Sequence, residues 1–150
     1  MSNETLPKAK LTTVADFPPG FLLENIAVRS DNSTLITVLN RKELWYVPPP
    51  VPAAPVLVHT FAQLTMGIVE VERDVFCLCT SNGYTDHESY LQRLDLRRWA
   101  PGEPLKPEAV LKFPEPVGAL NGCCLVAPNV ILVADSFAGL ICVSARLAAA

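Results

Sequence analysis

The sequence predicts an all-β protein because its apolar residues fall in short runs, turn residues separate these runs, and the pattern repeats along the chain. Half of the 150 residues are apolar, and the runs are rich in Val, Ile and Leu. Pro, Asn, Asp and Gly stand between them. Short apolar runs with such boundaries are typical of strands in antiparallel meanders. The stretch after Phe113 shows the pattern most clearly, with three predicted strands: Leu120–Val126, Val130–Ala134 and Leu140–Ala145.

The earlier part of the chain contains nine more predicted strands, which follow a polar tail at residues 1–10. Tight turns such as Asp31-Asn32 and Glu72–Asp74 connect neighbouring strands, because these residue types favour turn conformations. A proline-rich loop at 48–55 and a polar loop at 81–89 form longer connections. The nine strands are Leu11–Phe17, Leu22–Arg29, Leu35–Asn40, Leu44–Val47, Val56–Phe61, Met66–Val71, Val75–Thr80, Tyr90–Leu96 and Ala109–Phe113.

Three units of this pattern follow one another along the chain. The segments ENIAV, MGIVE and NGCCL begin them at Glu24, Met66 and Asn121, with spacings of 42 and 55 residues. Units of four antiparallel strands at such spacings are the signature of a β-propeller, in which each unit is one blade. A phenylalanine also ends the strand before each unit: Phe17, Phe61 and Phe113.

The strand count predicts an incomplete ring. The predicted blades span about residues 22–61, 66–113 and 120–145, and the third ends after its third strand. Leu11–Phe17 has the pattern of an outermost strand and could complete a blade. Twelve strands make three blades, whereas a propeller ring usually has at least four. Two interpretations remain open: a truncated half of a six-bladed ring, or a homodimer that forms a 3 + 3 ring in which each N-terminal strand completes the partner's third blade.

Composition and charge exclude several classes of partner. The formal charge is −3, so the chain lacks the basic surface that nucleic acid requires. Residues 1–10 lack the apolar core of a secretory signal, and the most apolar stretch, Val130–Val143, is too interrupted for a membrane span. We therefore expect one cytoplasmic domain over residues 11–145, followed by a short tail at 146–150. None of the five cysteines forms a CxxC pair, which favours buried free cysteines over a metal site or a disulfide.

Strand order places the predicted site at one end of the blades. In an antiparallel meander of four strands, the start of the first strand lies at the same end as the loop between the second and third strands. The end with the strand starts therefore gathers Glu24, Asn25, Met66 and Asn121, together with loop residues such as Tyr84 and Phe137.

Strand alternation also predicts the orientation of the cysteines. Cys123 and Cys124, as neighbours on a strand, should point to opposite faces, whereas Cys77 and Cys79 should share one face.

Three segments resemble a known family: LLENIAV at 22–28, PVLVHTF at 55–61 and LNGCCLVAPNVILVADS at 120–136. Over residues 11–145 the chain resembles the N-terminal half of fungal six-bladed propellers that are similar to the gluconolactonase, senescence-marker-protein and strictosidine-synthase-like superfamily. The resemblance implies catalytic roles for Glu24 and Asn121. In metal-dependent members the same positions hold Ca²⁺ or another divalent cation, and the enzyme hydrolyses a lactone or ester. Met66 occupies the middle ligand position, and its thioether is a poor ligand for hard cations.

The resemblance also implies a function that needs no cofactor. Fungal relatives of this branch act in secondary-metabolite pathways, and some resemble hetero-Diels–Alder cyclases, which are pericyclases. Such catalysis requires an apolar pocket that holds a diene and an alkene in reactive geometry, with a donor that polarises a carbonyl group. We therefore expect a small-molecule pocket protein, with a metal-dependent hydrolase and a truncated non-catalytic fragment as alternatives. The predicted substrate-binding residues are Phe21, Asn25, Met66, Tyr84 and Phe137.

Overall fold

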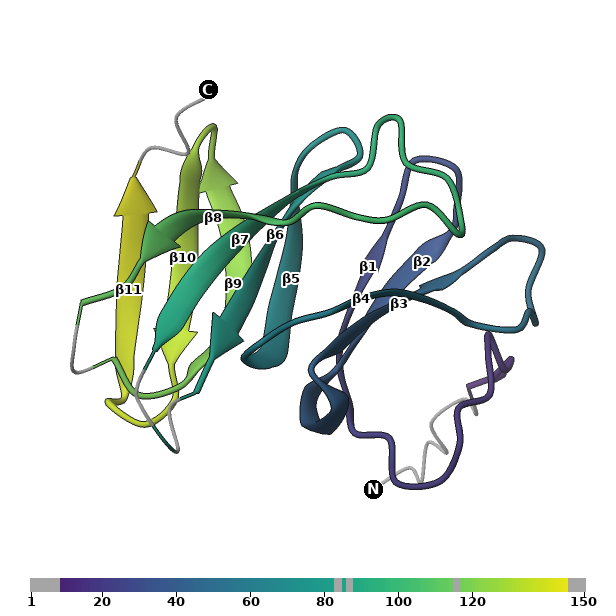
Figure 1. Cartoon of the computed structure of the whole chain (residues 1–150), viewed down its shortest axis with the longest axis horizontal. Helices are drawn as coiled ribbons and strands as arrows, with labels where there is room; N and C mark the ends of the chain where they lie inside the picture. The colour runs from purple at the N-terminus through teal and green to yellow at the C-terminus, as the bar shows by residue number, and fades with distance from the viewer. Residues whose placement is uncertain (1–8, 83–84, 86–87, 115–116, 146–150) are drawn as a thin grey trace, which may run out of the picture.

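The computed structural model describes residues 9–82, 85, 88–114 and 117–145, and it is an all-β structure (Figure 1). Eleven strands form three antiparallel sheets that lie side by side. One turn of 3-10 helix, Leu39–Arg41, is the only helical element among the described residues. No helix in this part of the chain is long and apolar enough to cross a membrane.

The first sheet contains β1 to β4 in sequence order, so each strand pairs with the strand before it. Its hairpins close through residues with positive φ angles, 66° at Asn32 and 60° at Lys42. Asn adopts this left-handed region more readily than most residues, which explains the Asp31-Asn32 turn. The strands are β1 Leu23–Val28, β2 Thr34–Val38, β3 Glu43–Val47 and β4 Val56–Thr60.

The second and third sheets repeat this meander. Asp74 and Asn129 have positive φ angles in the turns that follow β5 and β9. The third sheet has three strands, whereas the first and second have four. All eleven strands agree with predicted strands to within two residues at each end. The remaining strands are β5 Leu64–Glu72, β6 Val75–Ser81, β7 Ser89–Asp95, β8 Glu108–Lys112, β9 Leu120–Ala127, β10 Val130–Asp135 and β11 Leu140–Ala145.

The second sheet is packed between the other two (Figure 1). One apolar core joins it to the first sheet and includes Leu44 and Phe76. Another core joins it to the third sheet and includes Cys77, Cys79 and Ile131. Every residue of β6 is buried, because successive side chains of this strand enter the two cores alternately. The prediction that Cys77 and Cys79 share one face is confirmed.

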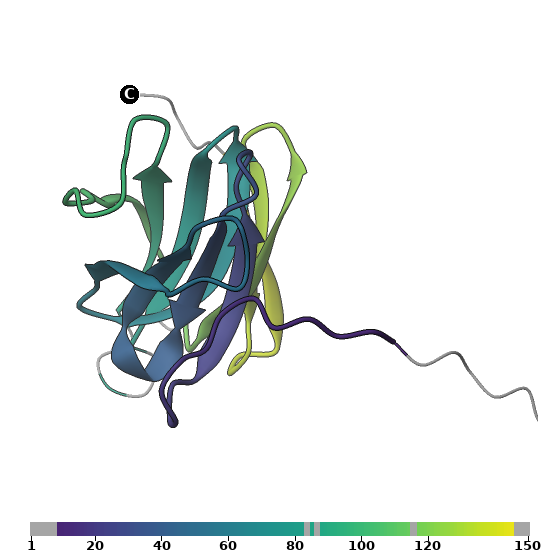
Figure 2. The ribbon, with the colours of Figure 1, turned by 90° about the vertical axis from the view of Figure 1, so that its right-hand side faces the viewer.

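The predicted strand Leu11–Phe17 is wrong, because the structure contains no strand in this segment. The segment lies beside the proline-rich loop instead, and the backbone N–H of Ala53 donates to the carbonyl O of Val14 at 3.1 Å. Proline has no N–H group, so a loop with five prolines offers few donors for a β ladder. The Phe17 ring packs against the Trp45 ring, with centroids 5.7 Å apart. The beginning of the described segment runs away from the three sheets (Figure 2).

Candidate functional site

The first strands of the three sheets, β1, β5 and β9, lie next to one another with β5 in the middle (Figure 1). All three begin at the end of the molecule where the β2–β3 and β10–β11 loops also lie. Side-chain hydrogen bonds connect the sheets at this end. Thr65 Oγ1 donates to the carbonyl O of Val38 at 3.2 Å, and Ser81 Oγ donates to the carbonyl O of Gly118 at 3.2 Å. The three strand starts therefore form one connected region.

A chain of hydrogen bonds fixes the start of β1 against β5. The backbone N–H of Asn25 donates to Thr37 Oγ1 at 3.1 Å, and Thr37 Oγ1 donates to the carbonyl O of Met66 at 3.0 Å. Thr37 is fully buried, so these bonds are shielded from water and stronger than exposed ones. Asn25 Oδ1 accepts the backbone N–H of Ile26 at 2.9 Å, which fixes the side chain on its own strand. Asn25 and Met66 thus lie on strands whose relative position is fixed.

A glycine allows β5 to approach β9 closely. A Cβ atom at Gly67 would lie 2.3 Å from the carbonyl O of Asn121 and 2.9 Å from the backbone N of Cys123. Any other residue would push the two strands apart. Met66 is only 6% exposed and packs in the core between the second and third sheets. The Asn121 side chain is half-buried and makes no hydrogen bond within the described residues, so its amide is available to a ligand.

Glu24 lies apart from Asn121 because β5 separates their strands. Glu24 lines a shallow hollow of about 180 Å³ together with Ile26 and Ile36. Ile26 and Ile36 face each other across β1 and β2 on the side of the first sheet turned away from the second. The Glu24 carboxylate makes no hydrogen bond or ion pair within the part of the chain that the structure describes. The structure does not bring the two predicted catalytic residues into contact.

Phe21 belongs to an aromatic cluster on the first sheet. Its ring centroid lies 6.0 Å from those of Phe17 and Trp45. The Arg41 guanidinium lies over the same ring, 5.2 Å from the centroid, in a cation–π contact. The Phe21 ring therefore covers Trp45 on the face of the first sheet that is turned away from the second sheet. Tyr84, another predicted binding residue, lies outside the described residues.

Asp135 organises the loop of the third sheet at the same end. Its buried carboxylate accepts the backbone N–H groups of Gly118 at 2.8 Å, Ala119 at 3.0 Å, and Phe137 and Ala138 at 3.1 Å each. Burial opposes the charged form, but the four hydrogen bonds outweigh it and lower the pKa of Asp135. The sequence placed Asp135 in a turn at this end of the blades but did not predict these hydrogen bonds. An Asp directly before a turn is a signal for such bonds, since its side chain reaches N–H groups two or three residues on. The Phe137 ring is held half-exposed beside this loop.

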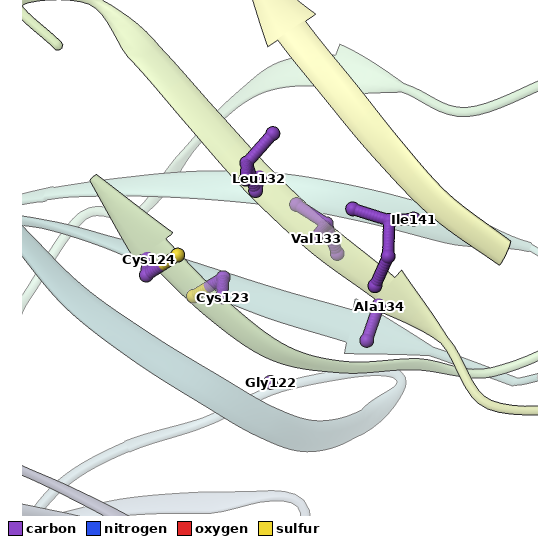
Figure 3. A pocket seen from close by; sticks show the side chains of 7 residues that line it. All are labelled: Gly122, Cys123, Cys124, Leu132, Val133, Ala134 and Ile141. Atoms are coloured by element: carbon purple, nitrogen blue, oxygen red, sulfur yellow. The ribbon is translucent and has the colours of Figure 1, made fainter. Parts of the chain in front are cut away.

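A second hollow, of about 390 Å³, lies on the third sheet (Figure 3). It is a shallow depression on an open sheet face, and its lining is apolar. Cys124 is exposed in this lining, whereas Cys123 contacts the core on the other side of β9, so the prediction that they point to opposite faces is confirmed. The lining residues are Gly122, Cys123, Cys124, Leu132, Val133, Ala134 and Ile141.

The residues present do not fit a site for a hard cation. Ca²⁺ takes about 6–8 oxygen ligands in proteins. Glu24 and Asn121 lie on strands that β5 separates, and Met66 on β5 offers only a buried thioether. Among the described residues, no three His, Cys, Asp or Glu side chains are close enough to hold a metal ion. No catalytic step through a metal follows from this arrangement.

Comparisons with known proteins assign no family. No protein-family model matches the chain, and no curated protein is significantly similar to it. The class that the structure defines is therefore an all-β protein of three packed antiparallel sheets. The resemblance to gluconolactonase-like propellers stays a prediction.

Proposed function

We propose that the three sheets are three blades of a six-bladed β-propeller and that the chain binds an apolar small molecule where β1, β5 and β9 begin. Each sheet is a meander whose first strand lies beside the first strand of the next sheet. The innermost strands of propeller blades have this arrangement around a central channel. The proposed ligand site is at the end of that channel.

The proposed activity is a pericyclic, hetero-Diels–Alder-like cyclisation in fungal secondary metabolism. Such a reaction converts three π bonds of the bound substrate into two σ bonds and one π bond, so no atom leaves and no other reactant is consumed. The protein has to hold the diene and the alkene in contact and polarise a carbonyl group. Neither task requires a nucleophile or a general base.

The observation that supports this activity is the available amide of Asn121 on a rigid strand junction. Its backbone is locked against Gly67, and its side chain has no partner within the described residues. A neutral N–H donor held in this way can polarise a carbonyl without changing its own protonation. A hydrolase would instead need a base that activates a water beside this donor, and β5 separates the strand of Glu24 from that of Asn121.

The test uses a heterodiene probe, an α,β-unsaturated ketone with a tethered alkene. We expect the protein to accelerate formation of a cyclic isomer of unchanged mass, with no effect of a chelator or of Glu24→Gln. Asn121→Ala should slow the reaction by about 10-fold or more, because it removes one preorganised donor. Asn129→Gly is the matched control, since it removes an amide at the other end of the third sheet and its φ of 62° suits glycine.

Three results would contradict the proposal. Cyclisation at the uncatalysed rate would exclude the activity. Chelator-sensitive hydrolysis of a γ-lactone probe, with addition of one water, would support the metal-dependent hydrolase instead. No rise in melting temperature with either probe would favour a non-catalytic fragment, because a ligand that binds only the folded state must stabilise it.

A further inference from the structure

The first and third sheets each leave much of one apolar face uncovered within the described residues. The third outer face, turned away from the second sheet, includes Ile141 and Val143, which are 67% and 63% exposed. The first outer face includes Ile26, which is 59% exposed, and Leu57. Monomeric proteins rarely expose contiguous apolar patches of this kind. The third outer face consists of Cys124, Leu132, Ala134, Ile141 and Val143, and the first outer face of Ile26, Val28, Ile36, Trp45 and Leu57.

The third sheet has no outer strand among the described residues. β4 and β8 complete the first and second sheets, whereas β11 pairs only with β10 among the described residues. Such an edge presents unpaired N–H and C=O groups to any extended segment. Leu11–Phe17 is the converse case, because it has a strand-like sequence but belongs to no sheet among the described residues. The described residues therefore include an edge strand with one open side and a strand-like segment that belongs to no sheet.

The position of Phe17 indicates where this segment belongs. Phe61 follows β4 and is buried in the core between the first and second sheets. Phe113 follows β8 and is buried in the core between the second and third sheets. Phe17 precedes β1 in the same way, and its ring contacts Trp45 on the first outer face. Phe17 therefore lies where the outer strand of a preceding sheet would contact the first sheet.

We propose that a second copy of this chain supplies the preceding sheet. β11 of one copy pairs with Leu11–Phe17 of the other copy by strand addition. The third outer face of the first copy then packs on the first outer face of the second. Each copy makes the same two contacts with the other, so the assembly closes as a two-fold dimer and leaves neither face open. The exposed side chains of both faces are mainly apolar, although Glu24 lies beside Ile26 and Ile36 on the first outer face. This inference rests on the sheets alone and does not depend on the proposed ligand.

The test is the solution mass of the full chain, measured by light scattering after size exclusion. We expect a dimer of about 33 kDa, twice the mass of the 16.3 kDa chain. Ile141→Asp places a charge on the third outer face, and Thr13→Pro removes an N–H from a segment that forms no strand within its own chain. Each variant should raise the dissociation constant by about 100-fold or more. Ala109→Asp, at an exposed position on β8, is the control that should leave the dimer intact.

A second readout is the reaction of Cys124 with a maleimide. The thiol is exposed in a single copy and covered in the dimer, so its labelling should slow as the protein concentration rises. A mass of 16.3 kDa at every concentration would overturn the proposal. A dimer that survives both Ile141→Asp and Thr13→Pro would overturn it as well, and so would a mixture of larger open oligomers.

Discussion

The second sheet and its two neighbours differ in how much of their apolar surface they bury. Every residue of β6 is buried, and no large apolar side chain described between residues 64 and 113 is exposed. The exposed ones belong instead to the first and third sheets, the loops beside them and the N-terminal segment. A sheet that is apolar on both faces needs a neighbour on each side. The first and third sheets therefore have the apolar composition of internal layers, but each has one face that no other described sheet covers.

The largest expected effect is the loss of a side chain from the middle of this stack. Phe76→Ala removes a fully buried ring between the first and second sheets and should lower the free energy of unfolding by about 3–5 kcal/mol. Leu57→Ala, on the exposed first outer face, should lower it by less than about 1 kcal/mol in dilute protein. Urea unfolding at low concentration measures both. Equal losses of stability for the two variants would contradict the proposed difference between the covered and the uncovered faces.

The next effect concerns the Asp135 loop. Asp135→Asn removes the charge that four backbone N–H groups stabilise, and should lower the free energy of unfolding by about 1–3 kcal/mol at neutral pH. The pKa of Asp135 is lowered in the folded protein, so this stability is present above the unfolded pKa of about 3.9 and is lost as pH falls through the folded pKa. Urea unfolding at a series of acidic pH values should show a smaller decline for the variant. An identical decline would contradict this account.

A smaller effect is expected at the opposite end of the sheets, where an ion pair joins the first and second sheets. Arg29 Nε donates to Asp74 Oδ1 at 3.1 Å, and Ser30 Oγ donates to Asp74 Oδ2 at 2.7 Å. The Ser30 hydroxyl, followed by Arg29, lowers the pKa of Asp74 against the opposing effect of burial. Asp74→Asn should therefore lower the free energy of unfolding by about 1–2 kcal/mol. A double-mutant cycle with Arg29→Ala should show positive coupling, and additive effects would mean that the pair does not join the sheets.

The smallest effect is expected at Glu24. Its exposed carboxylate has no partner within the described residues, so Glu24→Gln should change the free energy of unfolding by no more than about 0.5 kcal/mol. The same urea titration measures this change. A larger loss of stability would show that the Glu24 carboxylate stabilises the start of β1, contrary to this account.

The sequence was sufficient for the eleven strands, because local apolar runs and turn residues define them. The turn at Asp31-Asn32 shows this, since Asn32 adopts the left-handed conformation that its type favours. The error at Leu11–Phe17 has a different origin. This segment has a strand-like pattern, but a strand also needs an edge with free donors and acceptors, and local pattern contains no information about that edge.

Less of the candidate site could be predicted from the sequence. Strand order predicted which ends lie together, but the fixed contact of Gly67 with Asn121 depends on the distance between two sheets. The repeat pattern likewise gave Glu24 and Asn121 equivalent positions, although the middle sheet separates them. Phe21 was predicted to line the substrate pocket. The structure shows that its ring covers Trp45, a contact that depends on long-range packing, and its binding role stays a prediction.

Hydrogen exchange read by mass spectrometry tests the central claim most directly, namely that the third sheet is an internal layer lacking one strand and one neighbour. We expect the amides of β11 and of Leu11–Phe17 to gain protection together as the protein concentration rises, while β6 stays protected throughout. Rapid exchange of both segments at every concentration, beside a protected β6, would contradict the claim. It would show that the third sheet is stable with its outer face and edge open to water.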